Sequence, residues 1–399
     1  MSPGPERLMT VSRRTFLATV GAGSVGALAL PGITWRGREN LHAFQGVGQA
    51  PASRRADRLL ASTPGMVRID SNENPNGPGE HVYAAIRRRI AESNRYPVKS
   101  EDDLTDAIAK QHGVHADNVI IGCGSGELLR AAVQAFTAAD RGLVVPEPTF
   151  EAPANFAKFI GVPVVGRPVD ATLHTDLDAL ADAARDSRPG LIYLCNPNNP
   201  TATVHSHADV AAFIDRVNKR SPQTTILVDE AYHEYVDDPS YATAIPTAMA
   251  NPRVVVARTF SKVFGMAGLR VGYAIGQPAT LAKMSAWLLG SNVSQLSLVA
   301  ASATVANTSH IAIENKRNRE TRTLARAFFE KAGYKVPDCQ ANFMMIDIHR
   351  DVKAFKAECI KHKVAIGRQF PALPTYARVS FGTMPEMKKA FEVFKTTLA

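Results

Sequence analysis

Four short segments of the sequence carry side chains that could do chemistry, and each directly follows a short apolar run. They span residues 122–127, 196–201, 229–232 and 258–262. In open sheets built from alternating strands and helices, ligands bind outside the carboxyl ends of the strands. A site is therefore expected where these four segments meet.

The first segment favours binding of a phosphate, and the third favours binding of a cation. Gly122 to Glu127 is a glycine-rich turn into a helix, and such a turn offers backbone N–H groups and the positive end of the helix dipole to a phosphate. A tight turn without a ligand is the alternative. Asp229 directly follows an apolar strand, where a buried charge is costly without a cationic partner such as a protonated heterocyclic nitrogen. A helix-capping role for Asp229 remains open at this point.

The other two segments add a lysine and a loop rich in amides. Lys262 stands at the end of a buried strand and is followed by a glycine-containing turn and by Arg270. Its alternative is an ordinary surface lysine. The loop Asn196 to Thr201 holds three asparagines and two prolines, a composition that restrains the backbone and exposes amide donors.

The elements that must position these segments alternate between strands and helices. Segments with helical apolar spacing, such as Glu127–Phe136 and His207–Val217, separate short β-type runs, and this alternation predicts a mostly parallel, buried sheet. After about Ser291 the pattern changes to a long helical stretch through Lys331, a strand at Phe343–Ile348, a helix near Asp351–His362 and a strand near Arg378–Phe381. The expected strands of the sheet are Val119–Ile121, Leu143–Val145, Pro163–Val165, Leu191–Leu194, Thr225–Val228, Arg253–Ala257 and Val271–Ile275.

The fold class predicted is therefore α/β, with a large domain and a smaller α+β domain. We expect a signal segment at residues 1–43, a linker at 44–65, an N-terminal segment at 66–95 that packs with the small domain, the large domain at 96–290 and the small domain at 291–399.

The signal segment at residues 1–43 predicts that the protein is exported. Arg13 and Arg14 are followed by Phe16 and by a stretch of small and apolar residues from Ala18 to Leu30, which is too short for a stable membrane span. The segment resembles twin-arginine signals, which implies the twin-arginine export machinery as a partner and a periplasmic or secreted location. An uncleaved, anchored N-terminus is the alternative.

Composition excludes several classes of protein. Hydrophobic residues make up 45% and charged residues 21% of the 399 residues, as in ordinary folded proteins. The net charge of +9 lacks the dense basic stripe of nucleic-acid binders. The four cysteines have no metal-site spacing, so we expect buried free thiols and no metal.

Taken in order, these segments resemble the pyridoxal-phosphate-dependent aminotransferases of fold type I, class I and II, and most closely the histidinol-phosphate aminotransferase family. The resemblance extends over about residues 66–399 and includes the further segments 71–75, 77–78, 95–97, 148–150, 268–273, 342–343 and 378–383. It implies a mostly parallel seven-stranded sheet in the large domain, pyridoxal 5'-phosphate as cofactor, and amino acids and 2-oxo acids as small-molecule substrates.

The resemblance also implies a role for individual residues. Lys262 would hold the cofactor through a Schiff base and move the substrate proton, Asp229 would pair with the pyridine nitrogen, and Tyr232 would contact the phenolic oxygen. Tyr96 would reach the neighbouring subunit's site in a homodimer. The remaining cofactor-binding residues implied are Ser125, Gly126, Phe150, Asn199, Thr259, Ser261 and Arg270.

The substrate side of the site is implied in the same way. Arg378 matches the arginine that binds the substrate α-carboxylate, Arg368 matches an arginine for a substrate phosphate, and Asn72 is a further substrate-binding candidate. Ala202 departs from the family pattern, which usually has glycine there. A decarboxylase or lyase of the phosphothreonine type and an exported, non-catalytic ligand-binding relative are the alternatives to an aminotransferase.

Overall fold

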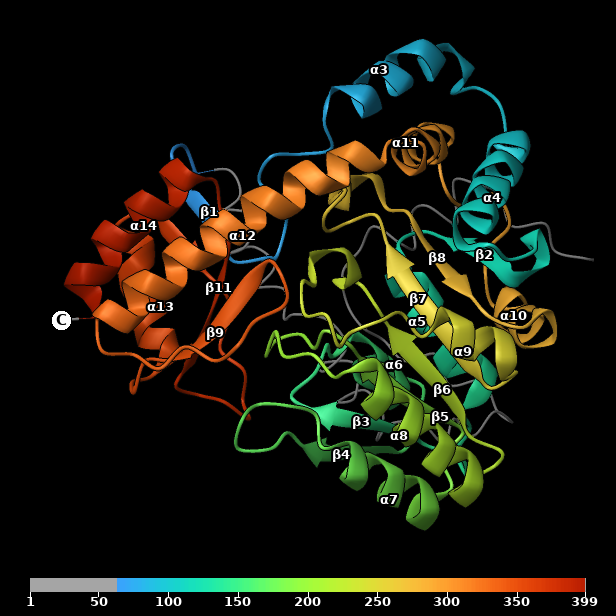
Figure 1. The fold of residues 1–399 in the computed structure, drawn as a ribbon. Helices are drawn as coiled ribbons and strands as arrows, with labels where there is room; N and C mark the ends of the chain where they lie inside the picture. The colour runs from blue at the N-terminus through green and yellow to red at the C-terminus, as the bar shows by residue number, and fades with distance from the viewer. Residues whose placement is uncertain (1–62, 399) are drawn as a thin grey trace, which may run out of the picture. The chain divides into compact units, whose positions relative to one another are not determined.

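The computed structural model describes residues 63–398, and its main feature is one seven-stranded sheet (Figure 1). The strand order is β2-β8-β7-β6-β5-β3-β4. Only β8 runs antiparallel to its neighbours, β2 and β7. The predicted mostly parallel sheet of seven strands is confirmed, with bounds β2 (Val119–Gly122), β3 (Leu143–Glu147), β4 (Val164–Pro168), β5 (Leu191–Cys195), β6 (Thr225–Asp229), β7 (Val254–Thr259) and β8 (Gly272–Ile275).

The central strands are apolar on both faces because helices cover both. Alternate residues belong to two separate clusters: Leu227 and Val255 pack with α5 and α6, whereas Ile226 and Val254 pack with α7 and α8. This is the pattern of a sheet buried on both sides. The helices of this region are α4 (Val98–His112), α5 (Ser125–Phe136), α6 (Ala152–Phe159), α7 (Leu177–Ser187), α8 (His207–Arg220), α9 (Ile245–Ala250) and α10 (Pro278–Ser285).

The C-terminal region, residues 291–398, contributes strands to two small two-stranded sheets. β9 (Phe343–Asp347) pairs antiparallel with β11 (Tyr376–Ser380). β10 (Val364–Ile366) pairs in parallel with β1 (Val67–Ile69), which joins the start of the described chain to the C-terminal region. α12 (Thr308–Lys331), α13 (Val352–Lys361) and α14 (Met384–Thr397) pack with these strands. The domain boundaries remain predictions.

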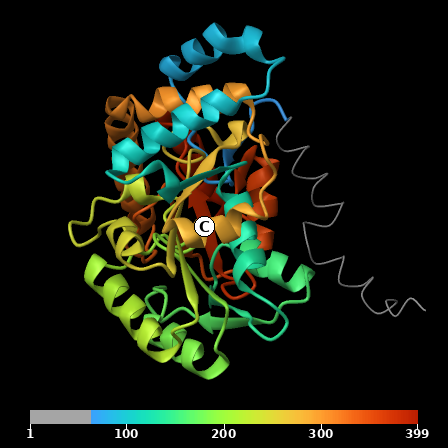
Figure 2. The ribbon, with the colours of Figure 1, turned by 90° about the vertical axis from the view of Figure 1, so that its right-hand side faces the viewer.

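One expectation for this region is wrong. The helical stretch from Ser291 to Lys331 is two helices, α11 (Gln295–Val305) and α12, bent by 82° at a short break. The side chain of Asn307 accepts a hydrogen bond from the backbone of His310 and starts the second helix, so a local cap interrupts the helical pattern. α11 lies against α3 (Glu80–Arg89) and α4 (Figures 1 and 2), while α12 continues into the C-terminal region.

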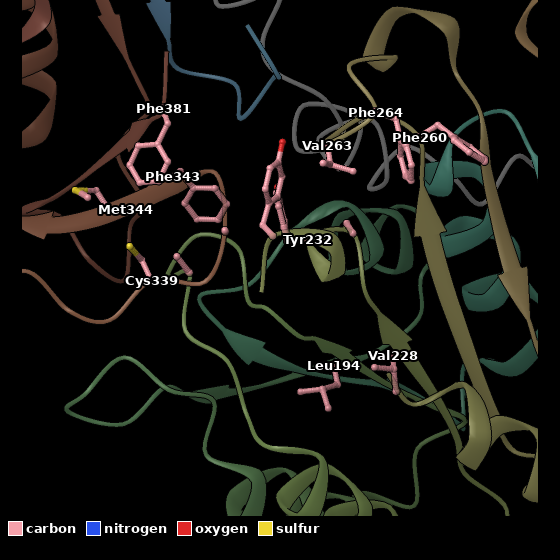
Figure 3. Close-up of a cluster of buried hydrophobic side chains, with 14 of the residues drawn as sticks. Leu194, Val228, Tyr232, Phe260, Val263, Phe264, Cys339, Phe343, Met344 and Phe381 are labelled. Carbon is pink, nitrogen blue, oxygen red and sulfur yellow. The ribbon is translucent and has the colours of Figure 1, made fainter. Parts of the chain in front are cut away.

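The two parts of the chain meet through a shared apolar cluster. Figure 3 shows Tyr232, which follows β6, between Val263 and Phe343, which begins β9. The ring centres of Tyr232 and Phe343 are 5.1 Å apart. The end of the sheet is thus held against the C-terminal region at the point where the predicted site lies.

The predicted twin-arginine segment lies outside the described residues. Within residues 63–398, no single helix is long and apolar enough to cross a membrane, and α11 with α12 meets that test only as a bent pair. The four cysteines are free thiols; three of them are buried, as predicted, whereas Cys123 is only half-buried.

Candidate active site

A cavity of about 600 Å³ lies at the carboxyl ends of the central strands. It is lined by the start of α5, the ends of β6 and β7, the N-terminal segment 68–73 and two arginines of the C-terminal region. All predicted site residues except Tyr96 line this one cavity: Asn72, Ser125, Gly126, Phe150, Asn199, Asp229, Tyr232, Thr259, Ser261, Lys262, Arg270, Arg368 and Arg378.

Asp229, the last residue of β6, is a buried carboxylate without a cationic hydrogen-bond partner in the described chain. It is 2% exposed and accepts hydrogen bonds from the Tyr193 hydroxyl at 2.8 Å and from the Ala231 backbone N–H at 3.1 Å. Burial raises its pKa to about 6, although these two donors and Lys262 act in the opposite direction. A positively charged ligand atom beside Asp229 would stabilise the ionised carboxylate.

Lys262 has the opposite property, because its surroundings favour the neutral amine. Burial, and then the positive charge of Arg378, lower its pKa to about 8. Its Nζ donates to the backbone oxygen of Asn72 at 3.2 Å and lies 5.5 Å from the centre of the Tyr232 ring. A lysine with such a pKa can act as a nucleophile or a base near neutral pH.

Asn72, whose backbone oxygen accepts the hydrogen bond from Lys262, is itself fixed by several contacts. It adopts φ 54°, in the left-handed region that asparagine tolerates. Its side chain donates to the Tyr232 hydroxyl at 3.1 Å and accepts from the Ser380 hydroxyl at 2.8 Å, and its backbone oxygen also accepts from the Asn342 amide at 3.1 Å. Segment 68–73, the turn after β6 and the end of β11 are thereby joined at one residue.

The start of α5 forms a cradle for an anion. The first N–H groups of a helix, here those of Ser125 and Gly126, have no intrahelical acceptor. A side chain on Gly124, which has φ 75°, would overlap Arg270, since a Cβ there would lie 2.3 Å from an Arg270 nitrogen. The arginine therefore lies against the backbone of the turn, where it adds positive charge to the helix N-terminus.

Two hydroxyl groups at the end of β7 complete this cradle. The Thr259 hydroxyl donates to Ser261 Oγ at 2.9 Å and accepts from the Ser261 backbone N–H at 3.1 Å. Both residues line the cavity together with Ser125 and Arg270. The set of backbone N–H groups, hydroxyls and a guanidinium suits a phosphate.

Arg378 is a second anion-binding group, held rigidly on β11. Its guanidinium donates to the Asn199 side-chain oxygen and to the Asp70 backbone oxygen, both at 2.8 Å. Its Nε is buried and has no partner among residues 63–398. The residue lines the cavity, where its positive charge can bind a carboxylate.

The loop of three asparagines divides its amides between structure and site. Asn196 and Asn198 bond within the protein, since the side chain of Asn196 accepts from the His205 N–H at 2.8 Å and that of Asn198 donates to the Pro148 oxygen at 3.1 Å. Only Asn199 of the three lines the cavity. Ala202 adopts φ 62°, which explains why glycine suits this position.

Tyr96 does not join the site of its own chain. Its side chain is 87% exposed and is not among the residues that line the cavity. It lies between α3 and α4, which pack against α11. Its predicted reach into a neighbouring subunit stays a prediction.

Sequence reasoning missed two residues that matter to this geometry. Tyr193 donates to Asp229, and a tyrosine in the otherwise apolar run Leu191–Cys195 is a signal, because a buried hydroxyl needs a partner. Glu151 forms an ion pair with Arg368 at the mouth of the cavity. No local pattern predicts that pair, because the two residues are far apart in the sequence.

Comparison with known proteins decides which family this site belongs to. The family model "Aminotransferase class I and II" matches residues 64–394. The chain belongs to the class I and II aminotransferases.

Its relatives include enzymes with two different named activities. The histidinol-phosphate aminotransferase of Symbiobacterium thermophilum is 33% identical over 335 residues, which cover 84% of this chain and 91% of the relative. The aromatic amino acid aminotransferase of Thermobifida fusca is 32% identical over 341 residues, which cover 86% and 92%. The aminotransferase is thus similar to enzymes that differ in their named substrates.

Solved structures agree with the fold. A protein of Erwinia carotovora atroseptica assigned as a histidinol-phosphate aminotransferase superposes on this aminotransferase with a TM-score of 0.80 at 30% identity, covering 84% of this chain and 97% of the other. The histidinol-phosphate aminotransferase of Sinorhizobium meliloti, solved with pyridoxal-5'-phosphate, gives a TM-score of 0.82 at 24% identity, covering 89% and 96%. The second likeness speaks for the fold alone.

Proposed function

We propose that this aminotransferase, whose cofactor is pyridoxal 5'-phosphate, moves an amino group between an amino acid and a 2-oxo acid or histidinol-phosphate-like substrate through the residues of the cavity described above. The observation that supports this most is the convergence of Lys262, Asp229 and Arg378 with the start of α5 on one cavity. An anion cradle, a carboxylate, an amine and a carboxylate-binding arginine are the groups that this reaction needs.

The residues present fit the cofactor. Ser125, Gly126, Thr259, Ser261 and Arg270 would hold its phosphate. Asp229 would pair with the pyridine nitrogen, which accounts for a buried carboxylate whose pKa is raised while no cation bonds to it. Asn199, Tyr232 and Phe150 line the same cavity and would contact the ring. When bound, the cofactor accepts the electron pair released at the substrate α-carbon.

The chain's own residues then have separate tasks. Arg378 binds the α-carboxylate and orients the amino acid, and Asn199 and Asp70 keep its guanidinium in place. Lys262, neutral in a large fraction of molecules near pH 8, would move the proton between the substrate α-carbon and the C4' atom of the cofactor. The hydrogen bond between Asn72 and Tyr232 fixes the tyrosine beside the lysine.

The substrate side chain would lie toward Arg368. This arginine lines the cavity together with Arg378, so an anionic side chain, such as a carboxylate or a phosphate, has a cation to bind. The relatives carry two different named activities, histidinol-phosphate and aromatic amino acid aminotransferase. Both substrate classes therefore belong in the test.

The test is a panel of amino donors and oxo acceptors, phosphorylated ones included, with the wild type and the Lys262→Ala variant. The purified enzyme should transfer amino groups, and the variant should lose this activity by at least about 10³-fold while keeping its circular dichroism spectrum. Release of carbon dioxide in place of amino transfer would favour the lyase. A variant that transfers at the wild-type rate would remove Lys262 from the mechanism.

Two further proposals concern the whole protein. Export is supported by Arg13, Arg14 and the apolar stretch that follows them. Changing both arginines to lysine should retain the protein in the cytoplasm, which cell fractionation would measure.

A homodimer is supported by the exposed apolar side chains of Tyr96, Trp287 and Leu289. Light scattering that gives the mass of one chain would contradict it.

A further inference from the structure

The mouth of the cavity contains an ion pair between two segments that are distant in the sequence. Glu151 directly precedes α6 and follows the cavity residue Phe150, and Arg368 lies between β10 and β11. Nη2 of Arg368 is paired with Oε1 of Glu151. Their side chains are 38% and 39% exposed, so the pair lies partly in solvent and can open without disturbing the core.

We propose that Glu151 determines the substrate preference of this aminotransferase, because it competes with anionic substrate side chains for Arg368. This inference rests on the function proposed above. A substrate with a neutral side chain leaves the pair between Glu151 and Arg368 intact. A substrate with a carboxylate or phosphate on its side chain must displace Glu151 before it can bind the same guanidinium.

The contrast between the two arginines supports this assignment. Arg378 is buried, and its guanidinium is engaged by Asn199 and by Asp70, so it suits the α-carboxylate that all amino acids share. Arg368 has an internal carboxylate as its charged partner. Of the two, only Arg368 must exchange one anion for another when an acidic substrate binds.

Phe370 keeps Arg368 in position for this exchange. The ring is buried, and the guanidinium carbon of Arg368 lies 4.1 Å from its centre, while that of Arg378 lies 5.3 Å from the same centre. Stacking of this kind holds a guanidinium without using its hydrogen-bond donors. Arg368 therefore remains beside the cavity when Glu151 moves away.

The charged side chains that line the cavity near Glu151 and Arg368 also favour binding of an anionic substrate side chain once Glu151 is displaced. Lys356 and Arg68 also line the cavity, so removing the Glu151 carboxylate leaves Arg368 among other cations with one carboxylate fewer. Burial and the neighbouring Arg378 lower the pKa of Arg368 to about 10, which still leaves it positively charged at neutral pH. The carboxylate of Glu73 lines the cavity as well, but it lies 3.8 Å from Arg68 and is not paired with Arg368.

The experiment measures binding of two unreactive acids to the cofactor-loaded enzyme by calorimetry. Glutarate carries a second carboxylate, and 3-phenylpropionate carries a neutral side chain. Glu151→Gln should tighten glutarate binding by about tenfold and change 3-phenylpropionate binding by less than about twofold. Arg368→Gln should weaken glutarate alone, and Glu151→Gln should have no effect when combined with it.

Glu73→Gln is the matched control, because it removes one negative charge from the same cavity without releasing Arg368. If it tightens glutarate binding as much as Glu151→Gln does, the effect is general electrostatics and the proposal is wrong. Equal changes for both acids in Glu151→Gln, or no change, would also overturn it. Failure of the wild type to transfer amino groups would refute the proposed function instead, and the binding comparison would still be informative about the competition.

Discussion

The inner end of the cavity and its mouth are built in different ways. At the inner end, Asp229 and Arg378 are buried and held by hydrogen bonds from neighbouring strands and loops. At the mouth, Arg368 pairs with Glu151 and Arg68 lies near Glu73, through side chains that are about a third to a half exposed. The inner groups are fixed, whereas the groups at the mouth can exchange partners.

This difference separates chemistry from substrate choice. The pKa of Asp229 is raised to about 6 and that of Lys262 is lowered to about 8, mainly because the fold removes water from the buried Asp229 and from the half-buried Lys262. Such shifts require a dry, rigid environment. Half-exposed ion pairs contribute little to stability, so they can change without loss of the fold. Substitutions at the inner end should therefore affect the rate with every substrate, and those at the mouth should affect only some substrates.

The largest expected effect is that of Asp229→Asn on turnover. The substitution preserves the shape of the side chain and removes its charge, so the ring nitrogen of the bound cofactor would lose its anionic partner. The rate constant kcat should fall by about 10³-fold with acidic and neutral amino donors alike. Steady-state kinetics with both donor classes measures this, and a loss confined to one class would break the distinction between the inner end and the mouth.

The same variant should gain stability when the cofactor is absent. A carboxyl whose pKa rises from 3.8 to about 6 on folding binds its proton more tightly in the folded state. Asp229 alone therefore lowers the free energy of unfolding by about 3 kcal/mol as the pH rises from about 4 to about 6. Asp229→Asn should remove this contribution, as urea unfolding of the cofactor-free wild type and variant at several pH values would show. A fall of equal size in the variant would assign it to another group.

The next expected effect concerns the reactivity of Lys262 in the cofactor-free protein. Because its pKa is lowered to about 8, its rate of acetylation by acetic anhydride should rise with pH to a plateau, with a midpoint near 8. An unperturbed lysine has a pKa near 10.4, so at pH 8 the neutral fraction of Lys262 should be about a hundredfold higher. Mass spectrometry of the acetylated peptides measures the acetylation of Lys262 and of unperturbed lysines in one sample. A midpoint above about 10 would contradict the burial of this amine.

Much of this structure could be predicted from the sequence, because its strands are short, apolar and separated by helices with regular spacing. All seven strands of the large sheet are found within about three residues of their predicted ends. The break between α11 and α12 escaped prediction, since Ala306 and Asn307 are compatible with a helix and only the cap formed by Asn307 reveals it.

The site shows a similar limit. Residues that end strands could be predicted, because parallel strands bring their carboxyl ends to one edge of the sheet, and thirteen of the fourteen predicted residues line the cavity. Partners such as Tyr193 and Glu151 could not, since what they contact depends on side-chain direction and on packing between distant segments. Tyr96 lies outside the cavity because α3 and α4 carry the chain away from it.

The smallest of these effects tests Tyr193, the partner that the sequence concealed. Tyr193→Phe removes the hydroxyl that donates to Asp229 at 2.8 Å, so the carboxylate loses one of two donors and its pKa should rise further. We expect kcat to fall by about tenfold, with KM changed by less than about threefold, since a lost hydrogen bond to a charged group costs about 1.5 kcal/mol or more.

Tyr273→Phe is the matched control for this change. Tyr273 is equally buried in the same sheet, but its hydroxyl contacts His112 on α4 at 3.0 Å instead of Asp229. A loss of packing or of stability would affect both variants, whereas a role in positioning Asp229 predicts that the acidic limb of the pH profile of kcat moves to higher pH only in Tyr193→Phe. If the two variants share one pH profile, Tyr193 supports the strand and does not tune the carboxylate. The inner end of the cavity would then depend on burial alone.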